Sequence, residues 1–413
     1  MTWPIVIILF ACVFLNRFGV PIGSYQIPLP AVVVATVFLA LALQNRVVIS
    51  ARMLVRYLCL CICAALPTFL ALDTPPSGTS VSVSSLYYLL ALYAFLVLRP
   101  RFAIGFEKTL SIFRAMIFVL AICAIFQFVA QFAGVRFFSF VGVVPNALLR
   151  EQHSNVVIPI WAGAAVYKSN GMFMSEPADL SQFLALGLVI EFVYFGNMLR
   201  VAVLLPALLM AFSGTGLLVL GFAVIMMSVT DRRLLAPLGR FAAVGAAVIP
   251  PLAAVAGPNY IQVFARRTTE VSSEGSSGYF RFVTPYKMVF ELASDPRLVI
   301  GFGPGTSERF EALQLGINAL TKMLIEYGVL GLCAYLWLMV SFAYQSEAKV
   351  LSSVGMFWFV FGGGYLLAPS VLYTLAALFL WGPGLQLATK TGFQTRSCSG
   401  PQPLLQWPAR IER

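Results

Sequence analysis

The sequence has few charged side chains. Only 10% of its 413 residues are Asp, Glu, Lys or Arg, whereas 60% are hydrophobic, and soluble domains carry about 25% charged residues. This composition excludes a soluble fold. Apolar runs long enough to cross about 30 Å of hydrocarbon recur along the chain, so helices must satisfy the backbone hydrogen bonds within the bilayer. The composition therefore predicts an all-α integral membrane protein.

Metal ligands are equally scarce. The chain contains one histidine, His153, and no Asp-x-Asp sequence, so no residue cluster is suited to binding Mg²⁺ or Zn²⁺. Cys59, Cys61 and Cys63 alternate within one apolar run and would point in different directions on a helix. We expect neither a metal site nor a cofactor, and interpret these cysteines as small residues of the membrane core.

The Lys and Arg residues lie mainly in alternate connections between the apolar segments. Because cytoplasmic loops of membrane proteins carry an excess of Lys and Arg, the connections at 44–56, 99–114 and 230–240 are predicted to be cytoplasmic, as are both termini. The net charge of +11 then reflects topology rather than binding to nucleic acid. The apolar segments, about twelve in number, lie near residues 4–22, 27–43, 54–72, 81–98, 110–134, 178–196, 200–212, 214–229, 240–256, 318–342, 350–364 and 369–386.

The chain is predicted to form one polytopic membrane domain over residues 1–390, followed by a disordered cytoplasmic tail at 391–413. Two long connections, at about 135–177 and 257–317, fall on the outer side of the membrane. Long loops follow the charge rule poorly, so their Lys and Arg residues need another explanation.

The second long loop contains signals for short surface helices. Thr284 can cap a helix whose first residue is Pro285, and Asp295-Pro296 would end it. Another short helix is predicted after Thr306, and the Ser- and Gly-rich stretch 272–278 is predicted to be a mobile loop. Such amphipathic segments lie along a membrane surface and can cover a cavity between the spans.

Two segments place polar residues where outer loops meet spans. The first, Lys168-Ser-Asn-Gly-Met-Phe-Met-Ser-Glu-Pro177, contains a cation and the carboxylate of Glu176 just before a helix. It is either an ordinary membrane-entry turn, with Glu176 favoured by the helix dipole, or part of a site. The second, Ser213-Gly-Thr-Gly216, separates two apolar runs, and its small residues and backbone N–H groups could meet an anion. Ser213 and Thr215 are therefore candidate binding residues.

The second long loop also supplies candidate cations. Arg281 offers a planar, permanently charged fork suited to a pyrophosphate, although an arginine here could equally pair with lipid headgroups. Arg266 is the next candidate in the same loop. The later sequence Gly301-Phe-Gly-Pro-Gly-Thr306 lacks the Gly-Lys-Ser/Thr of a nucleotide-binding loop, so we reject a nucleotide site.

The apolar segment near 318–342 carries ionisable residues. Lys322 and Glu326 stand four residues apart, so they either pair with each other or line a cavity. Because an unpaired charge within a membrane is costly, they indicate a functional region. Asn318, at the start of this segment, is a further candidate binding residue.

The order of these motifs is more specific than any one of them. A glycine turn ending in Glu-Pro, a Ser-Gly-Thr-Gly break, an outer loop ending in G-x-G-x-G, and Asn-Ala-Leu followed by Glu-x-Gly-x-x-Gly together resemble the O-antigen ligase and polymerase superfamily. The resemblance covers about residues 165–335, and is greatest to exopolysaccharide polymerases of the xanthan type.

The resemblance implies a metal-independent, GT-C-like glycosyltransferase of the bacterial inner membrane. Its donor would be an oligosaccharide on undecaprenyl pyrophosphate, used at the periplasmic face, and a chain-length regulator and a flippase of the same pathway would be its partners. By the same resemblance, Arg281 and Lys168 would meet the pyrophosphate, and Glu176 would orient or deprotonate the acceptor hydroxyl.

One departure from the superfamily bears on the reaction. Ligases of this superfamily usually have a histidine before the asparagine, where this chain has Ile317 before Asn318, and His153 lies in the first long loop. This favours a polymerase over a ligase. A transporter or flippase of lipid-linked glycan is the alternative of another class, for which inverted repeats or broken helices are expected.

Overall fold

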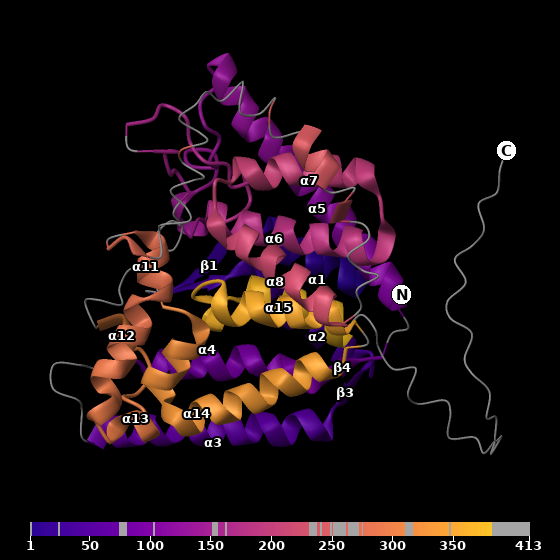
Figure 1. Cartoon of the computed structure of the whole chain (residues 1–413). Coiled ribbons are helices and arrows are strands. Elements are labelled where there is room, and N and C mark those ends of the chain that lie inside the picture. Colours follow the sequence, from indigo (N-terminus) through magenta and orange to yellow (C-terminus); the bar gives the residue numbers. More distant parts are fainter. Residues whose placement is uncertain are drawn as a thin grey trace.

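The computed structural model describes residues 2–23, 25–73, 81–101, 104–150, 156–161, 163–230, 238–239, 242–247, 250, 262, 272–274, 276–309, 317–346 and 348–381. Most of these residues are helical, and the longer helices run side by side across the molecule (Figure 1). The helices considered below are α1 (Trp3–Phe14), α2 (Leu29–Leu43), α3 (Ala51–Asp73), α4 (Val83–Ala94), α5 (Phe106–Val129), α6 (Pro177–Ile190), α7 (Met198–Met210), α8 (Gly214–Thr230), α11 (Ser277–Phe282), α12 (Thr284–Glu291), α13 (Arg297–Ile300), α14 (Ala319–Tyr344), α15 (Lys349–Phe361) and α16 (Pro369–Ala376).

Among the described residues, four helical stretches are long and apolar enough to cross a membrane, which is compatible with an all-α membrane protein. They are Ala51–Asp73, Phe106–Ala133, Pro177–Phe195 and Ala319–Tyr344. Shorter apolar helices occupy most of the other predicted segments: Trp3–Phe14, Leu29–Leu43, Val83–Val97, Met198–Met210, Gly214–Thr230, Lys349–Phe361 and Pro369–Trp381. The segment 240–256 and the tail 391–413 lie largely or wholly outside the described residues. A total of twelve spans therefore stays a prediction.

Two short strand pairs depart from the all-α prediction. Strand β1 (Gly19–Ile22) pairs antiparallel with β2 (Tyr25–Pro28), and β3 (Val47–Ile49) pairs antiparallel with β4 (Leu98–Pro100). The first predicted span, 4–22, thus ends as a helix at Phe14. Pro21 lacks an N–H for a helix, and the β-branched residues beside it favour an extended backbone. Hydropathy does not reveal the change from helix to strand, because apolar residues continue from α1 into β1.

The second long loop forms helices, as predicted in part. Helix α12 (Thr284–Glu291) has Pro285 in its first turn and leads through a 3-10 turn to Asp295, which confirms a helix there. Thr284 does not cap it, because the N-cap is Val283 and Thr284 is already helical. The stretch predicted as a mobile loop instead contains the start of α11, because the Ser276 hydroxyl accepts a hydrogen bond from the Tyr279 N–H at 3.1 Å and caps that helix. The helix predicted after Thr306 lies mostly outside the described residues.

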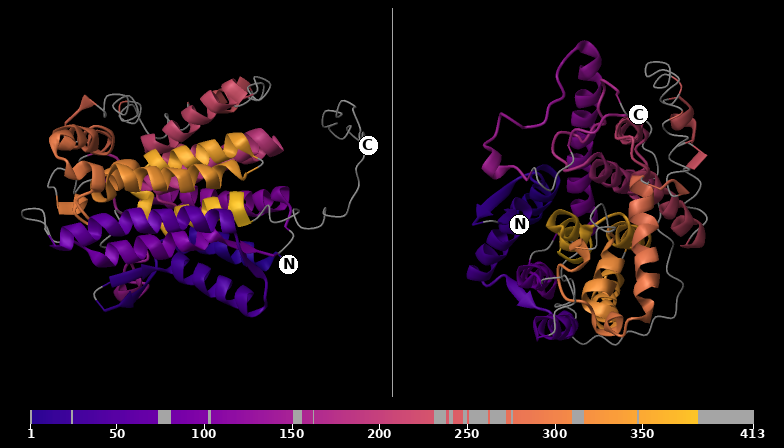
Figure 2. Two further views of the ribbon diagram at one scale, coloured as in Figure 1. Left: turned by 90° about the horizontal axis from the view of Figure 1, so that it is seen from below. Right: turned by 90° about the vertical axis from the view of Figure 1, so that its left-hand side faces the viewer.

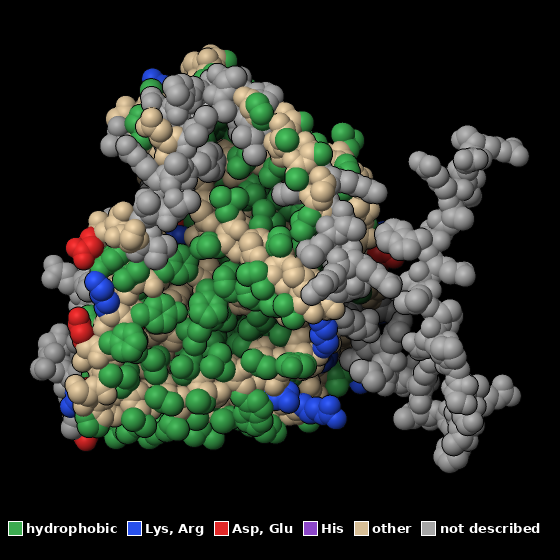
Figure 3. Space-filling model, viewed as in Figure 1, with side chains coloured by type: hydrophobic (Ala, Val, Ile, Leu, Met, Phe, Trp, Pro, Cys, Tyr) green, Lys and Arg blue, Asp and Glu red, His purple; other side chains and the backbone are tan. Residues whose placement is uncertain are grey.

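Described loops meet at two ends of the bundle, and the basic connection 230–240 lies largely outside the described residues. Pairing of β3 with β4 joins the connections 44–56 and 99–114 at one end. At the other end, Phe18 bridges to Leu149 and the Ser82 N–H donates to Pro304. Figure 1 places β3 and β4 on the right and α11 to α13 on the left. Figure 3 shows a hydrophobic face between these ends, with Lys and Arg side chains gathered near the right-hand end.

This grouping yields a topology prediction. Reporter fusions at Ser77 and Ser272 should report a location outside the cytoplasm, and fusions at Ser50 and Ala236 a location inside. The reason is that Lys and Arg concentrate in the connections that contain Ser50 and Ala236. Paired alkaline phosphatase and fluorescent-protein fusions measure this directly. A cytoplasmic signal at Ser272 would contradict any catalytic role of the second long loop outside the membrane.

Candidate functional site

A cavity of about 750 Å³ lies at the end of the bundle where the predicted outer loops meet. The first turns of α4, α6, α14 and α16 contribute Ser85, Asp179, Lys322 and Ser370 to its walls. Figure 2 (right) looks onto this end of the bundle. Because the N-terminal end of a helix carries partial positive charge, four such ends around one cavity favour an anionic ligand.

Two of the predicted site residues meet in this cavity. The Arg281 side chain, from the last turn of α11, donates to the Glu176 carboxylate at 3.0 Å, and both residues line the cavity. They are 105 residues apart in the sequence. Glu176 is the residue that precedes α6, as its position before Pro177 predicted. The two long outer loops therefore converge through this ion pair.

A second charged cluster forms another part of the wall. The Lys322 ammonium lies 2.6 Å from the Glu308 carboxylate and 3.7 Å from that of Glu326. Lys322 and Glu308 line the cavity, whereas Glu326 is 1% exposed and accepts a hydrogen bond from the Ser307 hydroxyl. The predicted Lys322–Glu326 pair is thus present. Lys322 lies at the cavity wall, and the buried Glu326 carboxylate lies behind it as a counter-ion.

The glycines of Gly301-Phe-Gly-Pro-Gly-Thr306 support this cluster structurally. Helix α14 is interrupted at Gly328, and the Phe302 and Gly303 N–H groups donate to the carbonyl oxygens of Ile325 and Glu326, both at 2.9 Å. The loop thus uses two of its N–H groups to satisfy carbonyls beside the break. It fixes the position of Glu326 next to Lys322.

Gly328→Ala should destabilise the protein. Gly328 has φ 68° and ψ −174°, and an added Cβ would lie 2.3 Å from the Ile300 carbonyl carbon. The backbone strain alone is about 1–3 kcal/mol, so the temperature of unfolding in detergent should fall. Gly221→Ala in α8 is the matched control, because nothing lies within 4 Å of its added Cβ. Equal stability of the two variants would contradict the break as a structural requirement.

The other predicted site residues lie elsewhere. Thr215, at the start of α8, has hydroxyl contacts with Ser213 at 2.9 Å and with Ser181 of α6 at 3.3 Å. These contacts tie α8 to α6, and neither Ser213 nor Thr215 lines the cavity. Lys168 does not line it either, and its backbone N–H donates to Ile158. Asn318 caps α14 by accepting the Thr321 N–H at 3.0 Å. Arg266 and His153 lie outside the described residues.

Three cavity residues were missed by the sequence analysis. Asp179 is not among the residues singled out from the sequence, yet it lines the cavity and its carboxylate accepts a hydrogen bond from the Tyr365 hydroxyl at 2.9 Å. Arg150 also lines the cavity, and burial lowers its pKa. Arg150 could have been predicted as a site residue, because it is an arginine in the first long outer loop. Tyr365 could not, because its position at the cavity depends on how α15 and α16 pack.

Metal ligands do not cluster in the part of the chain that the structure describes. It contains no group of three or more His, Cys, Asp or Glu side chains placed to hold a metal ion. The cavity groups that can act on a ligand are therefore cations, carboxylates, hydroxyls and helix ends.

The chain gave no match when compared with protein-family models, with curated proteins or with solved structures. The fold is predominantly helical, and the part of the chain that the structure describes includes four helices long and apolar enough to span a membrane. At one end of its bundle lies a cavity whose described lining includes three cations, Arg150, Arg281 and Lys322, and three carboxylates, Glu176, Asp179 and Glu308.

Proposed function

We propose that the protein is a polysaccharide polymerase, a membrane glycosyltransferase that joins oligosaccharide repeats carried on undecaprenyl pyrophosphate. The observation that carries this proposal is the Arg281–Glu176 ion pair at 3.0 Å. The sequence resemblance selects these two residues from different outer loops, and they lie together in a cavity among four helix N-termini. An accidental pair of surface charges has no reason to occupy such a cavity.

The cavity chemistry suits departure of a pyrophosphate. In the reaction, the bond between the anomeric carbon and the pyrophosphate oxygen breaks, and the electron pair stays on that oxygen. Arg281 can meet this charge with a bidentate fork, and the helix ends add fixed positive potential. Glu176 holds the guanidinium in place. A planar fork held by a second residue is suited to an anion whose charge grows during the reaction.

One observation favours the transporter alternative. Helix α14 is interrupted at Gly328, and interrupted helices are typical of transporter binding sites. The two functions differ in where substrate accumulates in cells lacking the protein. A missing polymerase leaves single lipid-linked repeats on the outer leaflet, whereas a missing flippase leaves them on the inner leaflet. Accumulation on the inner leaflet would contradict the polymerase proposal.

Turnover of a defined lipid-linked repeat tests the proposal directly. The purified protein in detergent should convert the repeat on undecaprenyl pyrophosphate into a ladder of longer products and release free undecaprenyl pyrophosphate. Products that appear only after lipid A core is added would instead identify a ligase. No consumption of either substrate pair would contradict glycosyl transfer.

Polymerisation should survive excess EDTA. The sequence offers no Asp-x-Asp and only one histidine, so Arg and Lys side chains are expected to stabilise the leaving group. The rate in the turnover assay should be the same before and after chelation. Loss of activity that returns on addition of Mg²⁺ would contradict this prediction.

A further inference from the structure

The cavity contains three carboxylates on the described residues, and they differ in what they contact. Glu176 pairs with Arg281 at 3.0 Å, and Glu308 pairs with Lys322 at 2.6 Å. Asp179 lines the same cavity, and its carboxylate accepts a hydrogen bond from the neutral Tyr365 hydroxyl. A carboxylate held by a guanidinium or an ammonium is a weaker proton acceptor than one held by a neutral hydroxyl. Asp179 is therefore the best placed proton acceptor among the three.

Asp179 also lies beside the groups that would hold the donor. Glu176 is the extended residue just before α6 and Asp179 lies in the first turn of that helix, and both line the cavity. An acceptor hydroxyl bound at Asp179 would therefore lie close to a pyrophosphate bound at Arg281.

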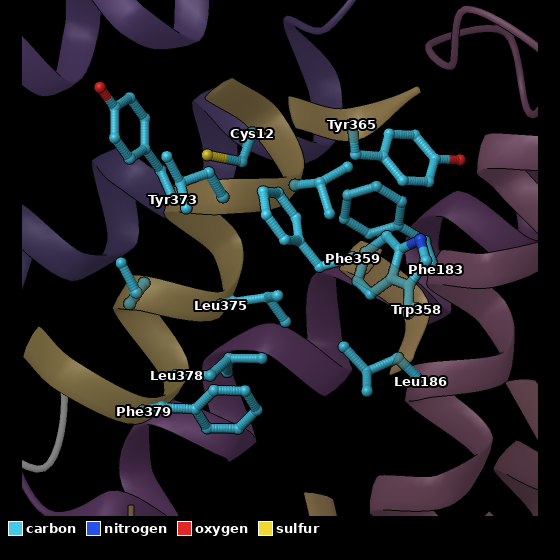
Figure 4. Close-up of a cluster of buried hydrophobic side chains, with 14 of the residues drawn as sticks. Cys12, Phe183, Leu186, Trp358, Phe359, Tyr365, Tyr373, Leu375, Leu378 and Phe379 are labelled. Atoms are coloured by element: carbon cyan, nitrogen blue, oxygen red, sulfur yellow. The ribbon is translucent and has the colours of Figure 1, made fainter. Parts of the chain in front are cut away.

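A chain of hydrogen bonds fixes the Asp179 carboxylate. Tyr365 donates to it at 2.9 Å and also contacts the Gln182 side-chain oxygen. Gln182 is itself held, because its oxygen accepts the Trp358 indole N–H at 2.7 Å and its amide donates to the Gly362 carbonyl at 2.9 Å. Figure 4 shows the Tyr365 ring beside Phe183 and Trp358, with its hydroxyl pointing out of the hydrophobic cluster. Burial raises the pKa of Tyr365 well above its ordinary value, so it remains a donor.

We propose that Asp179 is the general base that activates the acceptor sugar, and that Tyr365 positions it. This inference rests on the proposed glycosyl transfer. The acceptor oxygen bonds to the anomeric carbon as its proton passes to the Asp179 carboxylate. The bond from that carbon to the pyrophosphate breaks, its electron pair stays on the pyrophosphate, and the proton later leaves Asp179 for water. Glu176 then serves to hold Arg281 rather than to take the proton.

Azide separates the two halves of this reaction, because it is an anionic nucleophile that needs no deprotonation. The test supplies the purified protein with the lipid-linked repeat, with and without sodium azide, and measures polymer and glycosyl azide by mass spectrometry. Asp179→Asn should lower the polymer rate by roughly a hundredfold or more, the usual contribution of a general base. It should form glycosyl azide at a rate within about threefold of wild type, since leaving-group stabilisation is intact. Arg281→Ala should lose both products.

Tyr365→Phe provides a second variant in case Asp179→Asn does not fold. It removes only the hydroxyl, and should reduce polymer formation several-fold while leaving azide transfer unchanged. Arg297→Ala, at the exposed start of α13, is the control expected to keep both activities.

The outcomes distinguish this inference from the proposed function. If wild type forms neither product, the glycosyltransferase proposal itself is wrong. If wild type polymerises, Arg281→Ala is inactive and Asp179→Asn still polymerises normally, only the assignment of the base is wrong. Equal loss of polymer and glycosyl azide in folded Asp179→Asn would also overturn it, because the residue would then act on the donor. Wild-type polymer rates in Tyr365→Phe would remove the positioning role.

Discussion

Replacing Arg281 by alanine should lower the polymerisation rate by roughly a hundredfold to a thousandfold. Loss of one preorganised donor to a developing oxyanion costs about 2.7–4 kcal/mol of transition-state stabilisation. Arg281 lines the cavity and is fixed by Glu176 at 3.0 Å, so its donors are already oriented. The rate in the turnover assay, at equal amounts of inserted protein, measures this effect.

Arg281→Lys distinguishes this role from a contact with lipid headgroups. A headgroup contact is worth about 1 kcal/mol and accepts any cation, so Arg281→Lys would then leave the polymerisation rate unchanged. A bidentate fork on a pyrophosphate does not tolerate a point charge well, so lysine should lose most activity. Glu176→Gln should behave likewise because it releases the guanidinium, and Arg297→Ala should remain active.

Normal polymer from a folded Arg281→Ala variant would contradict the assignment. Lys168 and Arg266 are the next candidates from the sequence. The structure adds two cations that line the cavity itself, Arg150 and Lys322. The same assay on alanine variants of these residues would then identify the cation that meets the pyrophosphate.

Glu191→Ala should lower the free energy of unfolding by about 3–5 kcal/mol, the usual cost of removing one partner from a buried ion pair. Glu191 follows α6 and is 0% exposed, with the Arg114 guanidinium at 2.8 Å and that of Arg200 at 3.8 Å. Its loss leaves the largely buried Arg114 without a counter-ion. Thermal unfolding in detergent measures the effect.

Two comparisons make this stability prediction specific. Glu107→Gln, at an exposed position in the first turn of α5, should change stability by no more than about 0.5 kcal/mol. Replacing Glu191 and Arg114 together by apolar residues of similar size should cost much less than Glu191→Ala, because no buried charge is left unpaired. Equal losses in the single and double variants would contradict an electrostatic cause.

The sequence predicted the apolar segments well because hydrophobic length is a local property. Helices occupy most of the predicted segments, and the two basic connections 44–56 and 99–114 meet at one end of the bundle. Local signals also predicted a helix beginning near Thr284 and Pro285, although Val283 is its N-cap, and predicted that Glu176 precedes a helix. The strand at 19–22 was missed because hydropathy does not distinguish an apolar strand from the end of an apolar helix.

For the cavity, the sequence indicated which charged residues belong to a site but not which residues they contact. An arginine or a glutamate is costly to place near hydrocarbon, so Arg281, Glu176 and Lys322 attract attention without any structure. Ser213 and Thr215 carry no such cost. Their small size suits both an anion site and a close helix contact, and the structure uses them for the contact between α8 and α6.

The sequence by itself determined that this chain is built from apolar helices and which ionisable residues need an explanation, and it predicted how the loops divide between the two sides of a membrane. These properties follow from composition and spacing along the chain. Only the tertiary structure decided that Arg281 pairs with Glu176 across 105 residues, that Lys322 faces the cavity while Glu326 lies behind it, and that Tyr365 holds Asp179. The physical reason is that each of these contacts depends on which helix ends pack together, and packing between distant apolar helices leaves no periodic signal in the sequence.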